Sequence, residues 1–409
     1  MTKQGNIKSL PYRIMTPLRY FFNDSRAVGV LLIFCTVISL FLANTGGGLW
    51  YTGFWHAEIP GLANIMPETP GKWINDFLMA FFFLMAGMEI KRELLNGELS
   101  SFKKAILPFG AALGGMVAPA LIFILINAHS SYIHGWGIPT ATDIAFSLGV
   151  ASLFGKKFPV GLKILLMALA IIDDLGAIIV IALFYGAKIK WMFLGAAALI
   201  YGTLWACNLL KIKVGVVQLV LSLFLWYCVF NSGIEASITG VLVAFAMPLS
   251  ILPKVEKYIH TPVNFIILPL FALANTAVII PSNLSAAVTS TISLGVLLGL
   301  VVGKPVGIFL FSRLLVFFKV AKLPSSIKWN QLLGMGMLAG IGFTMSIFTT
   351  TLAYNTEAAR DMAKIAILLS MVGSLVISWV FFGLLSRKAA AHSINQLPDL
   401  HAVPEIAIN

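Results

Sequence analysis

The chain has 409 residues, of which 59% are hydrophobic and only 11% are charged, and its mean hydropathy is +0.94. This composition is typical of a polytopic membrane protein and excludes a soluble globular protein. The formal net charge of +12 could suggest nucleic acid or another anionic partner. The distribution of the basic residues indicates a membrane topology instead, so no nucleic-acid partner is predicted.

Apolar runs of about 20 residues recur from Ala27 onward, and each is long enough to cross a hydrocarbon core of about 30 Å as a helix. They predict an all-α polytopic fold with twelve transmembrane helices in a single membrane domain, 27–388. A cytoplasmic arm, 1–26, precedes this domain, and a cytoplasmic tail, 389–409, follows it. No cleavage site of the A-x-A type follows the arm, so we expect it to be retained.

The basic residues predict the orientation of the chain. With the N-terminus inside, 22 of the 28 lysines and arginines fall in inward segments and five in outward ones. Lys304 alone remains inside a span. This positive-inside bias predicts that both termini are cytoplasmic.

The longest outward loop is expected between Thr45 and Lys72, and it contains three consecutive glycines and three prolines. It could form a short hairpin that contacts a second protomer, which would make a homodimer. A plain ordered loop explains the same residues equally well.

Two predicted helices, the fourth and the eleventh, are interrupted by residues that disfavour a continuous helix. The first interruption is Pro139 with Thr142 and Asp143, and the second is Gly340 with Gly342 and Thr344. They occupy matching places in two helix triplets, 105–185 and 291–386, which insert with opposite orientations. One such break could be an ordinary kink, but two in register indicate an inverted-repeat transporter with a midplane site.

Two adjacent carboxylates, Asp173 and Asp174, lie in the middle of the fifth predicted helix. An ionisable side chain at the centre of a span costs roughly 2.5–3.5 kcal/mol and marks an ion or proton path. The tenth helix holds Lys304 within a run of glycines at every fourth position, from 295 to 307. The glycines predict close packing against a neighbouring helix. The lysine lies too deep to reach the interface easily, so it needs a carboxylate partner.

Several of these stretches resemble the NhaA-type sodium/proton antiporters. They are MALAIIDDLGAIIVIALFY, PTATDIAFSLGV, GKPVGI, GIGFTMSIF and WINDFLMAFFFLMAGMEIKREL. This family is itself a standard example of the inverted-repeat transporters, so the resemblance implies its fold. That fold has twelve helices, of which the fourth and eleventh are discontinuous and cross near the bilayer centre.

The resemblance also implies roles for individual residues. Asp174 would be the cation ligand, and Asp173 would be its proton-carrying companion, paired with Lys304 in one state. Asp143 and Thr142 would lie at the crossing of the two discontinuous helices, where Asp143 faces positive helix ends. For Thr142, a hydrogen bond to a freed carbonyl explains the hydroxyl as well as cation contact does.

A pH response is implied for charged helix ends. The residues concerned are Glu89, Arg92 and Glu93 at the end of the second predicted helix and Glu256 at the start of the ninth. Solvated helix ends with local ion pairs would explain the same residues. Glu235 departs from the family pattern, in which a histidine is familiar, and the two side chains titrate in different ranges.

The predicted function is therefore electrogenic, pH-regulated export of Na+, and of Li+ in addition, in exchange for H+ across a bacterial inner membrane. Membrane lipid is the surrounding partner, no cofactor is implied, and the protein is not an enzyme. A sodium-coupled organic solute symporter remains the alternative. An intramembrane aspartyl protease would need the pattern Gly-x-Gly-Asp, a channel would need repeated filter loops, and an ATP-driven pump would need a P-loop; none occurs in the sequence.

Overall fold

The computed structural model describes residues 25–394 apart from 63–64, 98, 156–157, 187 and 213–214. Every regular element in this part of the chain is a helix. Among the described residues, seven helices are long and apolar enough to cross a membrane, or up to nine if each of two bent pairs counts as one span. The described part of the chain therefore has the all-helical structure of a membrane protein. The expected N-terminal arm up to residue 24 and the tail from 395 lie outside the described residues.

The elements of the first half are α2 (Ser25–Ala43), α3 (Gly48–His56), α4 (Pro70–Lys72), η1 (Trp73–Leu78), α5 (Met79–Asn96), α6 (Phe102–Asn127), η2 (Ser131–Thr140), α7 (Ile144–Leu153), α8 (Val160–Phe184) and α9 (Trp191–Leu209). Those of the second half are α10 (Val216–Ser232), η4 (Ala236–Ile238), α11 (Thr239–Ala246), α12 (Leu252–Pro262), η5 (Val263–Ile267), α13 (Leu268–Asn275), α14 (Leu284–Val288), α15 (Thr291–Leu298), η6 (Gly299–Gly303), α16 (Lys304–Phe317), α17 (Trp329–Ala339), α18 (Phe343–Ala353) and α19 (Glu357–Ile394).

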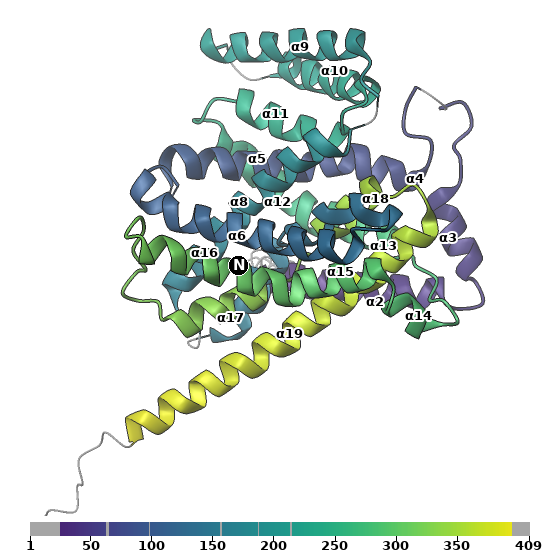
Figure 1. Cartoon of the computed structure of the whole chain (residues 1–409). Coiled ribbons are helices and arrows are strands. Elements are labelled where there is room, and N and C mark those ends of the chain that lie inside the picture. Colours follow the sequence, from purple (N-terminus) through teal and green to yellow (C-terminus); the bar gives the residue numbers. More distant parts are fainter. Residues whose placement is uncertain are drawn as a thin grey trace, which may run out of the picture.

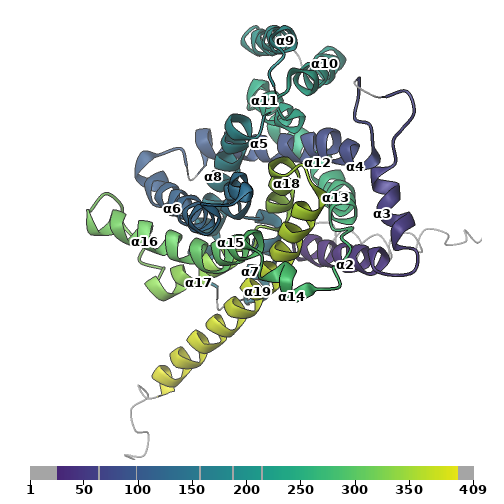
Figure 2. The ribbon, with the colours of Figure 1, turned by 45° about the vertical axis from the view of Figure 1, so that its right-hand side comes forward.

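The helices form a bundle with one separate layer at its edge. In Figures 1 and 2, α9 and α10 lie together at the top, next to α11, and α19 extends beyond the bundle at its C-terminal end. In the interior, α6 packs against α15 and α16, while α17 and α18 pack against α19. The elements α6, η2 with α7, and α8 therefore precede a second set, α15 with α16, α17 with α18, and α19, in the same order.

The run of glycines in α15, η6 and α16 allows the two sets to approach closely. A Cβ atom on Gly307 would stand 2.1 Å from the carbonyl oxygen of Gly114 in α6. At Gly303 it would stand 3.0 Å from the Cα atom of Pro119, also in α6. The close packing predicted for this glycine run is confirmed, because only a glycine leaves room for the neighbouring backbone.

Two of the three π-helical segments in the described part of the chain, η5 and η6, directly precede helices whose second residue is proline, Pro269 and Pro305. Proline lacks an N–H group, and its ring clashes with the carbonyl four residues earlier, so the regular hydrogen-bond pattern cannot continue. We attribute the widened turns to these prolines. The segment η6 ends immediately before Lys304.

The outward loop differs from the predicted hairpin. Its first part forms the helix α3, which is bent by 113° from α2. The backbone amide of Ile59 donates to the carbonyl of Glu68 at 2.7 Å, but no strand occurs among the described residues of the loop. A lone two-stranded hairpin is marginally stable, whereas α3 fixes its Tyr51 hydroxyl 3.0 Å from the carbonyl of Leu273 in α13.

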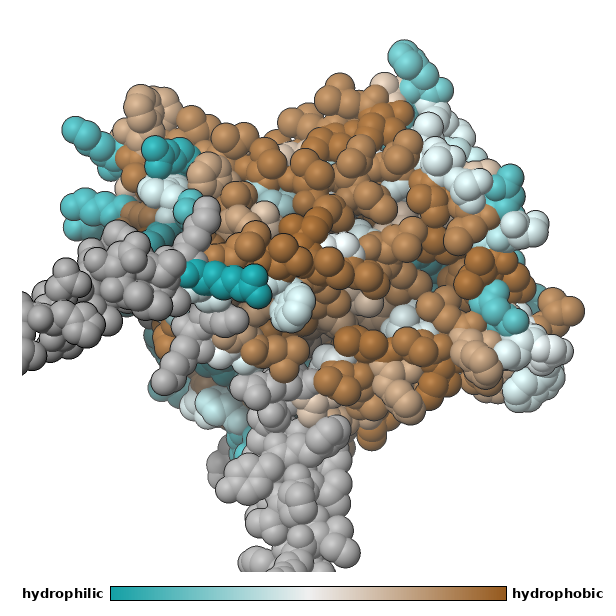
Figure 3. All heavy atoms as spheres, turned by 90° about the horizontal axis from the view of Figure 1, so that it is seen from below, coloured by the Kyte–Doolittle hydropathy of each residue, from teal (hydrophilic) through white to brown (hydrophobic). Residues whose placement is uncertain are grey.

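The surface of the bundle is strongly apolar. Figure 3 shows a broad hydrophobic face with hydrophilic residues gathered mainly toward its two sides. Large exposed side chains include Phe41 of α2 at 68% and Trp379 of α19 at 72%. Exposed apolar surface on this scale fits helices that face lipid.

Candidate ion-binding site

The centre of the site is an ion pair between two helices that are far apart in sequence. The Oδ2 atom of Asp173 in α8 lies 2.9 Å from Nζ of Lys304 in α16, and both side chains have no exposed surface. The same oxygen accepts a hydrogen bond of 2.7 Å from the hydroxyl of Thr142. The ammonium also donates to the carbonyl of Thr140, the last residue of η2. Lys304, for which the sequence predicted a carboxylate partner, thus lies opposite Asp173.

Asp143 occupies the point at which two helices begin. It is the N-cap of α7, and its Oδ1 atom accepts from the amide of Phe146 at 3.0 Å. Its Oδ2 atom accepts from the amide of Thr344 at 3.1 Å and from the Thr344 hydroxyl at 2.7 Å, in the first turn of α18. The amide groups at a helix start are unpaired and carry partial positive charge, so they stabilise this buried carboxylate.

The break between α17 and α18 faces the break between η2 and α7. The axes of α17 and α18 differ by 48°, and Gly340 and Gly342 lie at the bend. The amide of Asp143 donates to the carbonyl of Ile341 at 2.8 Å. The Thr142 hydroxyl lies 3.0 Å from the carbonyl of Ala339 as well as beside Asp173. Its single hydrogen can serve only one of these acceptors at a time. Pro139 lies one residue before the end of η2.

Asp174 lines a cavity of about 230 Å³, which we call the aspartate cavity. Its side chain is buried, and its Oδ1 atom has no hydrogen-bond partner within the described part of the chain. The polar residues lining the aspartate cavity are Glu89, Thr142, Asp143, Asp174, Glu256, His260, Asn264 and Thr344. The cavity therefore connects the carboxylate of Asp174 with the region in which the pH response was predicted.

Two of the residues predicted to respond to pH, Glu89 and Glu256, line this cavity, and Arg92 pairs with both of them. Nη1 of Arg92 is 2.6 Å from Oε2 of Glu256, and its Nη2 is 4.0 Å from Oε1 of Glu89. Glu93 lies on the same helix but does not line the aspartate cavity. Glu235 lies elsewhere, at the N-cap of η4, where it accepts from the Ser237 amide and hydroxyl. Burial raises the pKa of Glu235 to about 7, against the opposing effect of these hydrogen bonds.

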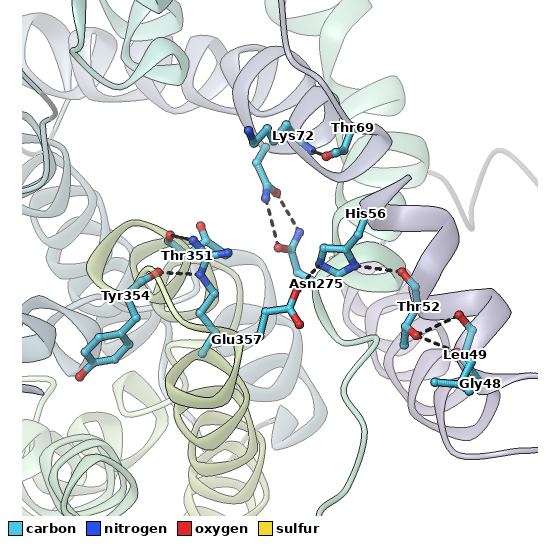
Figure 4. A network of polar contacts seen from close by, with 12 residues as sticks. Gly48, Leu49, Thr52, His56, Thr69, Lys72, Asn275, Thr351, Tyr354 and Glu357 are labelled. Atoms are coloured by element: carbon cyan, nitrogen blue, oxygen red, sulfur yellow. Dashed lines mark hydrogen bonds and ion pairs between the residues drawn. The ribbon is translucent and has the colours of Figure 1, made fainter. Parts of the chain in front are cut away.

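A second cavity of about 720 Å³, which we call the asparagine cavity, is lined by residues of α3, η1, α13, α18 and α19. At its wall, the side-chain amides of Asn75 and Asn275 exchange two hydrogen bonds, of 2.8 and 3.3 Å. At its rim, Nε2 of His56 lies 3.8 Å from Oε1 of Glu357 (Figure 4). The asparagine cavity also reaches Phe348, one turn of α18 beyond Thr344.

Some contacts of the site were missed by sequence reasoning. The hydroxyl of Ser147 donates to the carbonyl of Leu338 at 3.1 Å, and that of Ser346 donates to the carbonyl of Ile138 at 2.8 Å. Both hydroxyls satisfy carbonyls next to the breaks. Their position within the interrupted runs was the only available signal, because a serine hydroxyl in an apolar helix usually bonds its own backbone.

A multi-pass membrane protein that buries three aspartates and a lysine where η2, α7, α17 and α18 meet has the features of an ion transporter, not of an enzyme. The family model described as Na+/H+ antiporter 1 matches residues 19–382 of this chain. The Na(+)/H(+) antiporter NhaA of Cytophaga hutchinsonii is 44% identical over 382 residues, which cover 92% of this chain and 97% of that protein.

Two further relatives carry the same name. That of Flavobacterium psychrophilum is 46% identical over 365 residues, covering 88% of this chain and 94% of the relative. That of Vibrio cholerae is 42% identical over 372 residues, covering 88% and 96%. The chain therefore belongs to the Na+/H+ antiporter 1 family, and the resemblance seen in its sequence is confirmed. Its function is sodium/proton antiport, and the symporter alternative finds no support among these relatives.

Proposed function

We propose that Na+ and H+ exchange by competing for the carboxylate of Asp174. The observation that supports this most directly is the unpartnered Oδ1 atom of this buried side chain at the aspartate cavity. A buried carboxylate needs a counter-charge, and either a proton or a sodium ion can supply it. Binding of one ion at this oxygen therefore expels the other.

Oxygen atoms near Asp174 can complete the coordination of sodium. Hard cations prefer several oxygen ligands, and the Thr142 hydroxyl and the Asp143 carboxylate line the same cavity as Asp174. No group of three or more His, Cys, Asp or Glu suited to a metal ion occurs among the described residues. The ion would thus bind through few carboxylates and several neutral oxygens, which fits a transported ion that must be released again.

The ion pair of Asp173 and Lys304 couples proton movement to this binding. Neutralising Asp173 with a proton would release the ammonium, which the carbonyl of Thr140 also holds. Because the Thr142 hydroxyl contacts Asp173, a change at this pair reaches the cation ligands directly. Proton uptake at two neighbouring carboxylates for one sodium ion would make the exchange electrogenic, as the resemblance implies. The two aspartates would then titrate as a coupled pair.

Alternating access to the site is supported by the position of the two cavities. The aspartate cavity contacts α18 at Thr344 and Met345, and the asparagine cavity contacts it at Phe348. The buried ring of Phe348, which lines the asparagine cavity, lies 5.5 Å from the buried ring of Phe83. We assign this aromatic pair to the barrier that closes Asp174 from the asparagine cavity. The aspartate cavity would face the cytoplasm, because the excess of basic residues predicts that orientation.

The finer architecture belongs to the same proposal. We infer twelve spans in a single domain, 27–388, with inverted repeats at 105–185 and 291–386 and discontinuous fourth and eleventh spans. This count adds the shorter apolar helices Ile144–Leu153, Val216–Ser232 and Ala236–Ala246 to the bent pairs and the long helices. Both termini would be cytoplasmic in a bacterial inner membrane. Transport of Li+, specific lipid contacts and a homodimer stay predictions of the resemblance.

Everted membrane vesicles test the role of Asp174. Respiration acidifies their interior, a fluorescent amine reports the pH gradient, and added Na+ collapses the gradient if the protein exchanges it for H+. The wild type should collapse the gradient promptly, and Asp174→Asn should not, because an amide cannot take up a proton or balance the charge of sodium. Glu58→Gln, which alters an exposed carboxyl outside both cavities, should behave as wild type. Wild-type exchange by Asp174→Asn would refute the assignment.

A further inference from the structure

The segment η2 is a 3₁₀ helix of ten residues, Ser131–Thr140. Such helices rarely exceed three or four residues, because their hydrogen bonds are poorly aligned. A segment of this kind needs partners from outside itself when it lies within a membrane protein. The hydroxyls of Tyr185, Tyr354 and Ser346, which lie outside η2, supply these partners.

Tyr185, the first residue after α8, provides one of these hydroxyls. Its Oη atom donates to the carbonyl of His134 at 2.6 Å and accepts from the amide of Gly137 at 3.0 Å. One hydroxyl thus bridges a backbone acceptor and a backbone donor of η2. Burial raises the pKa of Tyr185 to about 12, so the hydroxyl keeps its proton at neutral and mildly alkaline pH.

Tyr354, the first residue after α18, holds the start of η2 in the same way. Its Oη atom donates to the carbonyl of Tyr132 at 3.0 Å. Its own carbonyl accepts from Nε of Arg360 at 2.6 Å, and Nη2 of Arg360 donates to the carbonyl of Thr351 at 3.1 Å. Figure 4 shows these bonds at Thr351 and Tyr354. The guanidinium therefore fixes the end of α18 from which the tyrosine ring reaches η2.

Two glycines of η2 make the approach of both hydroxyls possible. A Cβ atom on Gly137 would stand 2.7 Å from Oη of Tyr185, and one on Gly135 would stand 2.0 Å from Oη of Tyr354. Side chains at these positions would push the hydroxyls away from the backbone. The glycines and the tyrosines thus act as matched pairs.

The helix α8 consequently contacts the interrupted segment at two separate points. At one point Asp173 accepts from Thr142, and at the other Tyr185 bonds the middle of η2. Twelve residues separate Asp173 from Tyr185, which corresponds to about 18 Å along a helix. Two contacts this far apart fix the tilt and the axial position of η2 against α8. They also fix where the carbonyl of Thr140 meets Lys304.

We propose that Tyr185, assisted by Tyr354, is a positioning residue that sets the geometry of the ion-binding site by holding η2 in its 3₁₀ form. This inference rests on the proposed role of Asp174 and its neighbours. Neither tyrosine touches the ion. They act through η2 on Thr140 and Thr142, and through these on the pair of Asp173 and Lys304.

The test is Tyr185→Phe, which removes only the hydroxyl. Sodium-driven collapse of the pH gradient in everted vesicles gives an apparent KM for Na+ and a maximal rate at one alkaline pH. We expect KM to rise about fivefold, the equivalent of one ordinary hydrogen bond, with the maximal rate within about twofold of wild type. Gly137→Ala should shift KM in the same direction, and Tyr185→Phe combined with Tyr354→Phe should shift it further.

Tyr201→Phe is the matched control, because Tyr201 lies in α9 and lines neither cavity; its KM should stay unchanged. A wild-type KM for Tyr185→Phe overturns the inference. This holds even if the variant melts at a lower temperature in detergent, because the hydroxyl would then contribute to stability and not to the geometry of the site. Asp174→Asn in the same assay separates the two proposals. If it still exchanges ions, the proposed function fails. If it is inactive while Tyr185→Phe keeps a wild-type KM, only the positioning role fails.

Discussion

Lys304 and Asp173 carry opposite charges and form an ion pair in the interior of the protein. Both side chains have no exposed surface, and each has a further polar partner, the carbonyl of Thr140 and the hydroxyl of Thr142. Moving two charges out of water is expensive, and their attraction offsets that cost only while both are present. The pair therefore contributes little to stability as a whole, whereas either charge alone destabilises the fold.

Lys304→Met should lower the free energy of unfolding by about 3–5 kcal/mol, because it leaves the Asp173 carboxylate buried without its counter-charge. Adding Asp173→Asn should restore most of this loss, although the double variant lacks the exchange activity. Thermal unfolding of the purified protein in detergent measures both effects. Lys257→Met, at an exposed position of α12, is the control and should change little. A double variant no more stable than Lys304→Met would contradict the argument.

Glu235 is a residue whose charge depends on pH in the neutral range. Its pKa of about 7, raised by burial, exceeds the ordinary value of 4.5. As pH rises, the Glu235 carboxyl loses its proton in the unfolded chain before it does so in the folded protein. The free energy of unfolding therefore falls between about pH 4.5 and 7, and above pH 7 it stays at this lower value. Asp76 of η1 is a second carboxyl that interacts electrostatically with Glu235.

Glu235→Gln should therefore raise the melting temperature at pH 8 and leave it nearly unchanged at pH 4.5, because glutamine never acquires the charge. Melting curves of the two proteins in detergent between pH 4.5 and 8 test this. Glu58→Gln, at an exposed carboxyl, should not reproduce the pH-dependent gain. A gain that is equal at both pH values would show that the amide acts through packing and not through ionisation.

At the scale of elements, the contact of α6 with α16 depends on backbone approaching backbone. A Cβ atom added to Gly307 would lie only 2.1 Å from the carbonyl oxygen of Gly114, a distance that no real Cβ contact shows. The obstacle is backbone, so a side-chain rotation cannot relieve it. The same helix begins at Lys304, and a shift of α16 would move the ammonium.

Gly307→Ala should consequently destabilise the protein by about 1–3 kcal/mol or more. It should also weaken exchange, since α16 must move away from α6 and carries Lys304 with it. The melting temperature and the apparent KM for Na+ report the two effects. Gly202→Ala is the matched control: it lies in α9 with no neighbouring atom within 4 Å of its added Cβ, so it should be neutral or slightly stabilising. Equal melting temperatures for the two variants would argue against close packing here.

At the scale of the molecule, the two cavities contact successive turns of α18, the aspartate cavity at Thr344 and the asparagine cavity at Phe348, whose ring packs on Phe83. Asp174 lies on the side of the aspartate cavity. If this aromatic pair forms the proposed barrier, a small displacement of α18 against α5 would move it. Such an arrangement suits a protein that opens one path while it closes the other.

The basic residues predict which of the two cavities faces the cytoplasm, and thiol labelling can test this prediction. After replacement of Cys35, Cys207 and Cys228 by alanine, His260→Cys reports on the aspartate cavity and His56→Cys on the asparagine cavity. A membrane-impermeant thiol reagent should label His260→Cys in everted vesicles and His56→Cys in intact cells treated to admit the reagent to the periplasm. Labelling of both variants from one side would contradict the predicted orientation.

The residues that carry charge within apolar runs could be found without a structure, because burying a charge in a membrane is so costly that it rarely occurs without a function. Asp173, Asp174 and Lys304 were identified on that basis. The helix between residues 48 and 56 could not be foreseen, since a hairpin fits the same glycines and prolines. The contact of Tyr51 with α13, more than 200 residues away in the sequence, favours the helix over the hairpin.

The order of residues alone is enough to identify the membrane class, the carboxylates within apolar runs and, through the close match of several segments, the family. These properties follow from local hydropathy and residue identity, which do not depend on contacts. Which oxygen faces which partner depends instead on how the helices pack. This packing brings together Asp173 with Lys304, Asp143 with Thr344, and Tyr185 with η2. Each contact joins segments that are far apart in the sequence. Their distance in space is set by the packing of the two helix sets, so it cannot be inferred from their distance along the chain.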